Sequence, residues 1–341
     1  HAAAAHLLCD VIAAGAPPDR VAKKKHTTDG PWRQIVDREY AGLLADPAGA
    51  VIGGTAWDFP NVGRIPPASL DLLVIEEAGQ FCMANTIAVA PAARNLLLLG
   101  DPQQLPQVSQ GTHPEPVDGS ALGWLVEGRH TLSAERGYFL DRSHRMHPTV
   151  CDAVSRLSYD GRLHSVESVT AARQLSGHEP GVKVHLIPHE GNSTDSPEEA
   201  DWIVAEIQRC LGATWTDEHG TRTLTQDDVL VVTPYNAQVV LLRRRRDAAT
   251  YPSARAGRVP QSPGRGAPRV FVSMAASSVA DIPRGSSFLL NRNRLNVAIS
   301  RAKFAAVIVR STLLADYLPA SPDRLLELGA FLSLAQTPGT P

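Results

Sequence analysis

Short apolar runs of strand length recur along this chain, and each of them ends abruptly in polar residues. In the first part of the chain these runs are Ala50–Gly53, Leu72–Ile75 and Leu96–Leu99. A continuous apolar run of this length is typical of a strand that is buried on both faces of a parallel sheet. The segments between the runs read as helices or loops, so the pattern predicts an α/β fold built on parallel sheets.

A second set of apolar runs follows in the later part of the chain. We expect strands near Val182–Ile187, Val229–Thr233, Val270–Met274 and Ala305–Val309. Helices are expected over 1–12 and 120–126, and a surface connection over 110–119. The pattern therefore predicts two α/β units, at 1–134 and 135–317, followed by a carboxyl-terminal tail at 318–341.

Two of the predicted strands end in side chains suited to nucleotide chemistry. Glu76 and Glu77 follow the run at 72–75, and Gln104 lies in the turn after the run at 96–99. The carboxyl edge of a parallel sheet is where nucleotides bind. We assign Glu76 to a Mg²⁺ ion held through its water shell, Glu77 to the attacking water, and Gln104 to a terminal phosphate. The alternative is a buried strand capped by two solvated glutamates.

The same segments resemble the motifs of a known family. Glu76–Gln80 (EEAGQ) and Gly100–Pro106 (GDPQQLP) are similar to motifs II and III of superfamily 1 helicases, in the group that contains the nonsense-decay RNA helicase and the nuclease-helicases. Further matches occur in the family's order: Gly53–Thr55, Ser143–Pro148 like motif IV, Thr233–Gln238, and Leu295–Lys303 like motif VI. Several motifs in order are far more specific than any single one.

The resemblance implies a fold, an activity and a mechanism. It implies two RecA-like parallel-sheet domains of the P-loop NTPase class. The first domain would be incomplete and would contain motifs Ic, II and III. The second would be an AAA-type carboxyl-terminal helicase domain with motifs IV to VI. ATP would be hydrolysed with Mg²⁺ in the cleft between the domains, and cyclic closure would move single-stranded nucleic acid. The implied substrate is DNA rather than RNA, the implied direction is 5′ to 3′, and a RecB-like nuclease can be fused to the full-length protein.

Arginines of the second unit are suited to stabilising charge during phosphoryl transfer, because the guanidinium is planar and always charged. By resemblance, Arg145 and Arg301 are the arginine fingers. Arg294 is a weaker candidate for binding the cofactor or for tying motif VI to its neighbours, and Asp101 is assigned to the nucleotide together with Glu76. For Arg145 and for Arg301, the alternative is an ordinary salt bridge.

The resemblance also implies contacts to nucleic acid. They are Gly54, Thr55, Pro234, Tyr235, Asn236 and Gln238. Tyr235 is suited to stacking on a base or to packing beneath its loop, and the sequence does not decide between these roles. The run Arg243–Arg246 lies on a predicted helix, where four consecutive residues point all around the axis. We expect a solvated helix end with favourable charges near its carboxyl terminus, and the alternative is that one or two of these arginines touch phosphate.

The chain departs from the family in three places. No G-x-x-x-x-G-K-[ST] loop occurs in the sequence, and without its amides and lysine ATP loses much of its binding energy. The segment 257–266 (GRVPQSPGRG) replaces motif V, and Glu76 stands where the family commonly has Asp. We therefore expect an amino-terminally truncated part of an active helicase that is inactive alone. The alternative is a non-catalytic remnant that binds nucleic acid or a partner.

Composition narrows the classes of function further. The 341 residues are 43% hydrophobic with no apolar run long enough to cross a bilayer, so no membrane partner is expected. The formal net charge of −2 argues against nucleic-acid binding through overall charge and requires a local groove. Four separated cysteines form no C-x-x-C pair, so no zinc or iron–sulfur site is indicated and a reduced, cytoplasmic setting is expected.

Overall fold

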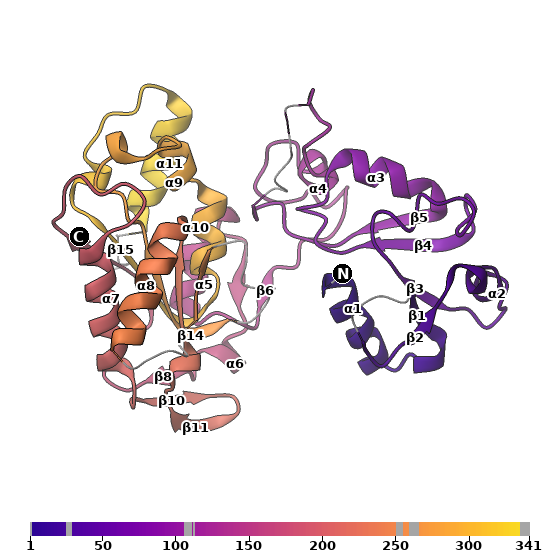
Figure 1. Ribbon diagram of the computed structural model, residues 1–341, viewed down its shortest axis with the longest axis horizontal. Helices are drawn as coiled ribbons and strands as arrows, with labels where there is room; N and C mark the ends of the chain where they lie inside the picture. Colours follow the sequence, from indigo (N-terminus) through magenta and orange to yellow (C-terminus); the bar gives the residue numbers. More distant parts are fainter. Residues whose placement is uncertain are drawn as a thin grey trace. The chain divides into compact units, whose positions relative to one another are not determined.

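The chain divides into two compact units, His1–Leu132 and Ser133–Pro341 (Figure 1). The structure is a computed structural model, and it describes residues 2–24, 29–105, 111, 113–249, 255–258 and 266–334. The division lies close to the predicted boundary between 134 and 135. Each unit is an α/β structure on parallel strands, as the apolar runs predict.

The first unit contains two small parallel sheets. In one, β1 (Val21–Lys24) pairs with β2 (Arg33–Ile35) and β3 (Val51–Gly53). In the other, β4 (Leu70–Ile75) pairs with β5 (Ala93–Leu98). The strands β3, β4 and β5 lie at predicted runs. The strands β1 and β2 are not evident from the sequence because they are short and contain charged residues.

Helices and apolar clusters complete the first unit, one of these clusters being formed by Leu8, Val21 and Trp32. The helices are α1 (Ala2–Ala13), α2 (Tyr40–Leu44), α3 (Met83–Val89) and α4 (Ala121–Leu125). A second cluster is centred on Ile35 and Tyr40, and a third on Leu73 and Leu122. Ser120 begins α4 by accepting a hydrogen bond from the Gly123 amide at 2.9 Å, which is the usual role of serine at a helix start.

The paired strands β4 and β5 are incompletely covered. Four leucines on or next to these strands are between 39% and 50% exposed: Leu72, Leu96, Leu97 and Leu99. Parallel sheets are normally covered on both faces, and an exposed apolar surface of this kind is typical of a contact region.

The second unit is built on one five-stranded, all-parallel sheet with the order β13-β12-β14-β15-β9. Its strands are β9 (Gly181–Ile187), β12 (Val229–Thr233), β13 (Arg255–Arg258), β14 (Ala267–Ser273) and β15 (Ala302–Ser311). Four of these strands occur at predicted runs. The edge strand β13 has no apolar run to reveal it.

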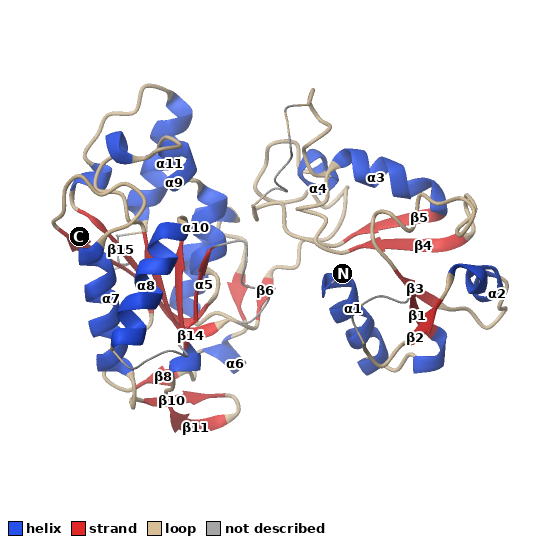
Figure 2. Cartoon of the chain, in the orientation of Figure 1, coloured by secondary structure: helices blue, strands red, loops and turns tan. Residues whose placement is uncertain are grey.

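Both faces of this sheet are buried, which explains its continuous apolar runs. Alternate side chains of β12, β14 and β15 pack with α7 (Pro197–Cys210) and α8 (Asn236–Ala248) on one face. The helices α5 (Pro148–Ser158) and α10 (Arg292–Ile299) cover the other face (Figure 2). Helix α7 begins where Ser196 accepts a hydrogen bond from the Glu199 amide, with Pro197 in the first turn.

Smaller elements surround this layered core. Two short parallel strands pair, β6 (Arg142–Ser143) and β7 (His164–Ser165). A hairpin of β10 (Thr214–Asp217) and β11 (Gly220–Thr223) pairs with β8 (Gln174–Leu175). The remaining helices are α6 (Glu167–Thr170), α9 (Ser286–Leu289) and α11 (Pro322–Ser333). Helix α11 lies within the predicted tail and contacts α9 and α10.

None of the helices in the described ranges combines the length and the apolar character that crossing a membrane requires.

Candidate functional site

The predicted acidic turn lies where β4 and β5 end side by side. Backbone pairing continues past the strands, since the Ala78 amide donates to the Leu99 carbonyl oxygen at 2.8 Å. The two turns then approach so closely that a Cβ atom at Gly79 would lie 2.1 Å from the Asp101 carbonyl oxygen, and one at Gly100 would lie 2.6 Å from the Ala78 amide nitrogen. Both glycines are therefore required for the turns to meet.

Gln80 joins the two turns through its side chain. Its Nε2 atom donates to Glu77 Oε2 at 3.3 Å and to Gln104 Oε1 at 3.2 Å. Glu77 has φ = 55°, a left-handed conformation that is uncommon for this residue type and that clusters at functional sites. The structure thus brings Glu77 and Gln104 together and adds Gln80, to which the sequence motif alone gives no role.

Glu76 has the surroundings of a cation ligand. Its Oε2 atom is buried and has no hydrogen-bond partner among the residues that the structure describes. Burial raises the pKa of this carboxyl group, and the charge of Glu77 raises it further. A divalent cation would compensate both effects, so the site fits the predicted Mg²⁺ ion.

Among the residues that the structure describes, no group of three or more His, Cys, Asp or Glu side chains is arranged to hold a metal ion. An ion at Glu76 would therefore be held by one carboxylate, by waters and by substrate phosphates. Mg²⁺ commonly binds in this way, since it gives up its waters reluctantly.

Asp101 stabilises the turn that carries Gln104. Its Oδ1 atom accepts a hydrogen bond from the Gln103 amide at 2.9 Å, and its carbonyl oxygen accepts one from the Gln104 amide at 3.3 Å. The buried side chain of Gln103 donates to the His130 carbonyl oxygen at 3.0 Å. These bonds fix the backbone beside the acidic turn, so Asp101 supports the site as well as standing next to it.

The predicted strand contacts of the first unit follow β3 directly. The amide and the hydroxyl of Thr55 both donate to Asp58 Oδ2, at 2.8 and 2.9 Å. Arg64 in turn lies 3.3 Å from Asp58 Oδ1. Gly54 and Thr55 therefore belong to an ordered, half-buried turn, and the Thr55 hydroxyl is already bound to Asp58.

In the second unit, the predicted residues fall at opposite edges of the sheet. Arg301 precedes β15 and Arg145 precedes α5, at the edge where the strands begin. The segment Pro234–Gln238 follows β12, at the edge where the strands end. The residues expected to stabilise phosphate charge are thus separated from those expected to bind nucleic acid by the length of the strands.

Arg145 and Arg301 meet at Gly266, immediately before β14. A Cβ atom at Gly266 would lie 2.9 Å from the Arg301 carbonyl oxygen and 3.1 Å from Arg145 Cδ. Arg145 Nη1 also approaches the Ser300 carbonyl oxygen at 3.5 Å. The two arginines therefore share one point of the sheet edge, beside the altered segment 257–266, of which 259–265 lie outside the described residues.

A buried arginine holds the loop that carries Arg145. Arg173 is 2% exposed, and it donates to the carbonyl oxygens of His144, at 3.1 Å, and of Arg145. Its Nε and Nη2 atoms bind the Glu218 carboxylate at 3.0 and 2.8 Å. These hydrogen bonds lower the pKa of Glu218. Nothing in the sequence points to Arg173, because its partners lie far away along the chain.

Replacing Arg173 by methionine is expected to lower the free energy of unfolding by about 3 kcal/mol, because two carbonyls and a carboxylate lose their donor. Amide hydrogen exchange over residues 143–147 should become faster, since the loop loses its support. Urea denaturation and exchange mass spectrometry measure the two effects.

The control for this prediction is Arg156→Met, which removes an exposed ion pair with Asp152 on α5. Its expected cost is below about 0.5 kcal/mol. Equal effects of the two substitutions, or unchanged exchange over 143–147 in the Arg173 variant, would contradict a supporting role for Arg173.

Among the predicted strand contacts after β12, only Asn236 is exposed. Pro234 and Tyr235 are buried, and Gln238 is fully buried. The Gln238 side chain accepts a hydrogen bond from the Ser196 amide at 2.8 Å and donates to Ser273 Oγ at 2.9 Å. These hydrogen bonds connect α8 to the neighbouring loops. In this conformation Gln238 has no exposed surface with which to contact a nucleic-acid strand.

Glu199 is the centre of a buried polar network at the same edge. Its side chain is fully buried, and its Oε2 atom accepts hydrogen bonds from Ser273 Oγ at 2.6 Å and from the Ala275 amide at 3.0 Å. Its Oε1 atom lies 3.2 Å from His189 Nε2, and His189 Nδ1 lies 2.8 Å from Ser277 Oγ. The network connects the segments that follow β9 and β14 to the start of α7.

The structure places Arg294 with Tyr235 rather than with Arg301. Arg294 Nε donates to the Phe288 carbonyl oxygen at 2.9 Å, and the guanidinium lies 4.2 Å from the Phe288 ring centroid. The Tyr235 and Phe288 ring centroids are 5.6 Å apart. Arg294 lies near the start of α10, and Arg301 follows its end. Because a helix rises about 1.5 Å per residue, the length of α10 separates the two arginines. Packing, one of the two roles open for Tyr235, is the role it has here.

The arginine run on α8 is divided by burial. Arg246 is 6% exposed, whereas the three residues before it are exposed. Arg245 Nε lies 2.8 Å from Asp201 Oδ1 on α7. The four side chains thus point in different directions, as helical geometry requires.

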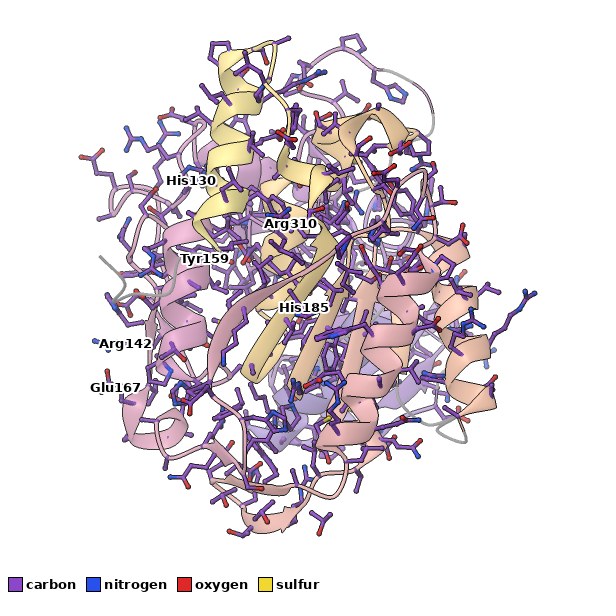
Figure 3. All side chains as sticks on the ribbon, turned by 90° about the vertical axis from the view of Figure 1, so that its left-hand side faces the viewer. His130, Arg142, Tyr159, Glu167, His185 and Arg310 are labelled. Atoms are coloured by element: carbon purple, nitrogen blue, oxygen red, sulfur yellow. The ribbon has the colours of Figure 1, made fainter. Side chains whose placement is uncertain are left out.

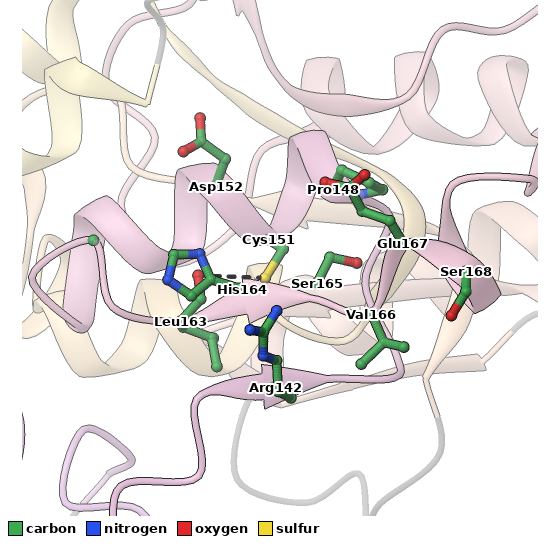
Figure 4. A pocket seen from close by; sticks show the side chains of 11 residues that line it. Arg142, Pro148, Cys151, Asp152, Leu163, His164, Ser165, Val166, Glu167 and Ser168 are labelled. Atoms are coloured by element: carbon green, nitrogen blue, oxygen red, sulfur yellow. Dashed lines mark hydrogen bonds between the residues drawn. The ribbon is translucent and has the colours of Figure 1, made fainter.

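A surface hollow of about 820 Å³ lies at the start of α5, between this helix, β7 and α6 (Figure 4). Arg142 and Glu167 line it and lie on the same flank of the unit (Figure 3). Cys151 also lines it, and burial raises the pKa of that thiol to about 11. None of the predicted site residues lines this hollow, although its lining residues Arg142 and Pro148 lie on either side of Arg145 along the chain.

Comparison with known proteins matches residues 125–312, more than half of the chain, to the family described as "AAA domain". "DNA-binding protein SMUBP-2" of Mesocricetus auratus is 26% identical over 303 residues, which cover 81% of this chain and 29% of that protein. "DNA replication ATP-dependent helicase/nuclease JHS1" of Arabidopsis thaliana is 26% identical over 264 residues, which cover 71% and 19%. "Probable helicase senataxin" of Mus musculus is 23% identical, with 74% and 10% covered.

This chain therefore spans less than a third of the length of each of these relatives. Among solved structures, the arterivirus nonstructural protein 10 helicase is 18% identical with a TM-score of 0.46, and the match covers 91% of this chain and 51% of that one. The same helicase in complex with DNA is 16% identical with a TM-score of 0.46, with 96% and 55% covered.

Proposed function

The chain belongs to the superfamily 1 helicases, in the AAA domain family that its residues 125–312 match, and on this premise we propose that it is the motor core of an ATP-dependent nucleic-acid translocase. Its parallel-sheet α/β units have the architecture of RecA-like, P-loop NTPase domains. The proposed domain limits are 1–134 and 135–317. The observation that carries the proposal is that the Arg145 side chain and the Arg301 backbone adjoin the same residue, Gly266, at one edge of the sheet.

In the first unit, the proposed nucleotide site is the acidic turn after β4. A bound Mg²⁺ ion would neutralise charge on the ATP phosphates. Glu76, with its buried and unpartnered oxygen, would hold this ion through water. Glu77 would orient the attacking water, and Gln80 holds it in a fixed relation to Gln104, the proposed sensor of the terminal phosphate.

In the second unit, Arg145 and Arg301 are proposed to stabilise the charge that spreads over the transferring phosphoryl group. A guanidinium group is positively charged and offers several donors in one plane. The Arg145 side chain and the Arg301 backbone both adjoin Gly266, so the two side chains start from the same edge of the sheet. Arg173 supports this arrangement by holding the backbone of the Arg145 loop.

Nucleic acid is proposed to bind at Gly54 and Thr55 in the first unit and along Pro234–Gln238 in the second. Asn236 is the proposed direct contact of the second loop, because it is exposed. The buried Pro234, Tyr235 and Gln238 are proposed to shape that loop. DNA rather than RNA is the proposed substrate; the names of two relatives refer to DNA binding and DNA replication, and that of a third refers to an exoribonuclease.

Two further features of the full-length protein are proposals from the family resemblance alone, namely translocation in the 5′ to 3′ direction and a fused nuclease. A cytoplasmic location is a proposal from the four separated cysteines. The word nuclease occurs in the name of the Arabidopsis relative, of which this chain spans 19%.

The exposed leucines of β4 and β5 support a further element of the proposal. A parallel sheet buries both faces when it is complete. On β4 and β5, however, the residues Leu72, Leu96 and Leu97 are between 40% and 50% exposed. We propose that a protein segment carrying a phosphate-binding loop covers this surface in the active protein. Such a loop would supply the amides and the lysine that the sequence of this chain lacks.

The experiment that tests the proposed function measures ATP hydrolysis by the full-length protein that contains this chain and a phosphate-binding loop. We expect hydrolysis to require Mg²⁺ and to rise when single-stranded DNA is added. A protein that binds single strands without hydrolysing ATP would instead be a non-catalytic binding remnant. The two prolines in the segment that replaces motif V favour this second candidate function.

A further inference from the structure

Four side chains form a compact cluster next to the proposed nucleic-acid loop of the second unit. Phe288 is at its centre, with the Arg294 guanidinium 4.2 Å and the Arg284 guanidinium 5.1 Å from its ring centroid. Tyr235 completes the cluster, with its ring centroid 5.6 Å from that of Phe288. We call Arg284, Phe288, Arg294 and Tyr235 the arginine–aromatic cluster. Two cations held against one ring create a concentrated positive charge on a chain whose net charge is −2.

The cluster lies where parallel α/β sheets bind their ligands. The strands β12 and β14 are neighbours, but the chain leaves β12 through α8 toward the edge strand β13 and leaves β14 through α9 and α10 toward β15. The connections therefore diverge at the carboxyl ends of β12 and β14. Such a divergence opens a crevice in which ligands of open parallel sheets are found. Tyr235 lies two residues after the end of β12. Phe288 lies on α9, Arg284 lies two residues before α9, and Arg294 lies in the first turn of α10.

Arg284 is available for an anion. It is exposed, and within the described ranges its guanidinium has no hydrogen bond and no ion pair. Its contact with Phe288 orients the side chain, so less conformational entropy would be lost when it binds. The neighbouring Gly285 has φ = 77°, a conformation that glycine adopts freely, and it begins α9.

Tyr235 supplies a second indication of a ligand. The residue is 7% exposed, and its hydroxyl is buried without a hydrogen-bond partner among the residues described. A buried hydroxyl normally finds a partner, because leaving it unpaired costs free energy. The cluster thus places two guanidinium groups beside a buried hydroxyl that has no acceptor, and phosphate oxygens are acceptors that suit guanidinium donors.

We propose that the arginine–aromatic cluster binds a phosphodiester group of single-stranded nucleic acid, with Arg284 as the direct contact. This inference rests on the proposed function and adds Arg284 and Phe288 to its nucleic-acid surface. Phe288 positions Arg284 and Arg294 rather than stacking on a base, since its ring already contacts both guanidinium groups. The contact carries no sequence information, because it is made to the backbone.

The test measures binding of a fluorescein-labelled oligothymidylate of about 20 nucleotides to this chain by fluorescence anisotropy, at KCl concentrations from about 50 to 200 mM. For Arg284→Ala we expect an affinity about tenfold lower at low salt and a salt slope smaller by about 0.7, the value for one lost phosphate contact on a single strand. Arg284→Lys should recover the salt slope and only part of the affinity, since it keeps the charge and loses the planar fork.

The matched control is Arg209→Ala. Arg209 lies in the last turn of α7, at the opposite edge of the sheet, and its side chain is 63% exposed. The substitution changes the net charge by the same amount as Arg284→Ala, so any effect of overall charge appears in both variants. We expect wild-type affinity and slope for it.

The outcomes distinguish this inference from the function on which it rests. If the wild-type chain does not bind the oligonucleotide, the proposed function of this unit is overturned together with the inference. If the wild type binds and Arg284→Ala behaves like Arg209→Ala, only the inference is overturned. The phosphates of ATP are the other source of the same chemistry. If Arg284→Ala weakens binding of a fluorescent ATP analogue and leaves oligonucleotide binding unchanged, the cluster is a nucleotide site.

Discussion

Replacing Arg301 by alanine is expected to lower ATP turnover by about 10³-fold or more in the full-length protein, while the affinity for single-stranded DNA stays within about twofold of wild type. Arg301 and Arg145 share one point of the sheet edge, and Arg301 lies at the end of the motif VI match. An arginine that stabilises the transferring phosphoryl group acts mainly in the transition state, so its loss lowers the turnover number more than it raises KM.

Two further variants sharpen this prediction. Arg301→Lys keeps the positive charge but loses the planar fork, and it should remain far less active than wild type. Asn236→Ala, at the opposite edge of the sheet, should weaken single-strand binding and leave the basal turnover measured without DNA unchanged. Steady-state ATP hydrolysis and oligonucleotide anisotropy separate the two effects. A turnover in Arg301→Ala within about threefold of wild type would remove Arg301 from the proposed catalytic group.

The sheet of the second unit could be predicted from the sequence because its strands are buried on both faces. The runs Val229–Thr233 and Val270–Met274 are almost entirely apolar, and the observed strands β12 and β14 are buried along their whole length. The hairpin β10–β11 could not be predicted in the same way. Its second strand is fully exposed and consists of Gly, Thr and Arg, so no apolar pattern marks it.

The sequence predicted which loops lie at the ends of strands, but it did not predict which side chains of those loops are exposed to solvent. The segment Pro234–Gln238 does lie at the carboxyl end of a strand, but only Asn236 in the predicted set is exposed there. Motif spacing specifies the position of a residue along the chain. Whether its side chain faces solvent depends on contacts with residues that are distant in sequence, such as the hydrogen bond between Gln238 and Ser273.

Residues that act through long-range hydrogen bonds left no signal in the sequence. Arg173 and Glu199 are single charged residues in otherwise ordinary segments, and Glu199 reads as one of two acidic residues in the first turn of a helix. The structure distinguishes the two, because Glu199 is buried within the sheet edge while Glu198 is exposed. Because their surroundings differ, replacement by alanine is expected to change the free energy of unfolding much more at Glu199 than at Glu198.

Replacing Glu199 by alanine is expected to lower the free energy of unfolding by about 4 kcal/mol. The substitution removes the acceptor of Ser273 Oγ and of the Ala275 amide, and it leaves His189 without its carboxylate partner. Buried polar groups without partners are costly, and the lost side-chain volume adds a cavity in a fully buried position. Urea denaturation followed by tryptophan fluorescence measures the effect, since Trp215 is fully buried in the same unit.

Glu198→Ala is the matched control, because it makes the same change one residue earlier. Glu198 is exposed and accepts hydrogen bonds from Ser196 Oγ at 2.9 Å and from Asn192 Nδ2 at 2.7 Å, so we expect a loss below about 1 kcal/mol. Glu199→Gln should fall between the two, since an amide can accept from Ser273 and donate to His189. If Glu199→Ala cost no more than Glu198→Ala, the segments after β9 and β14 would have to be held by other contacts. The large difference expected between adjacent glutamates follows from burial and hydrogen bonding, which the sequence alone does not show.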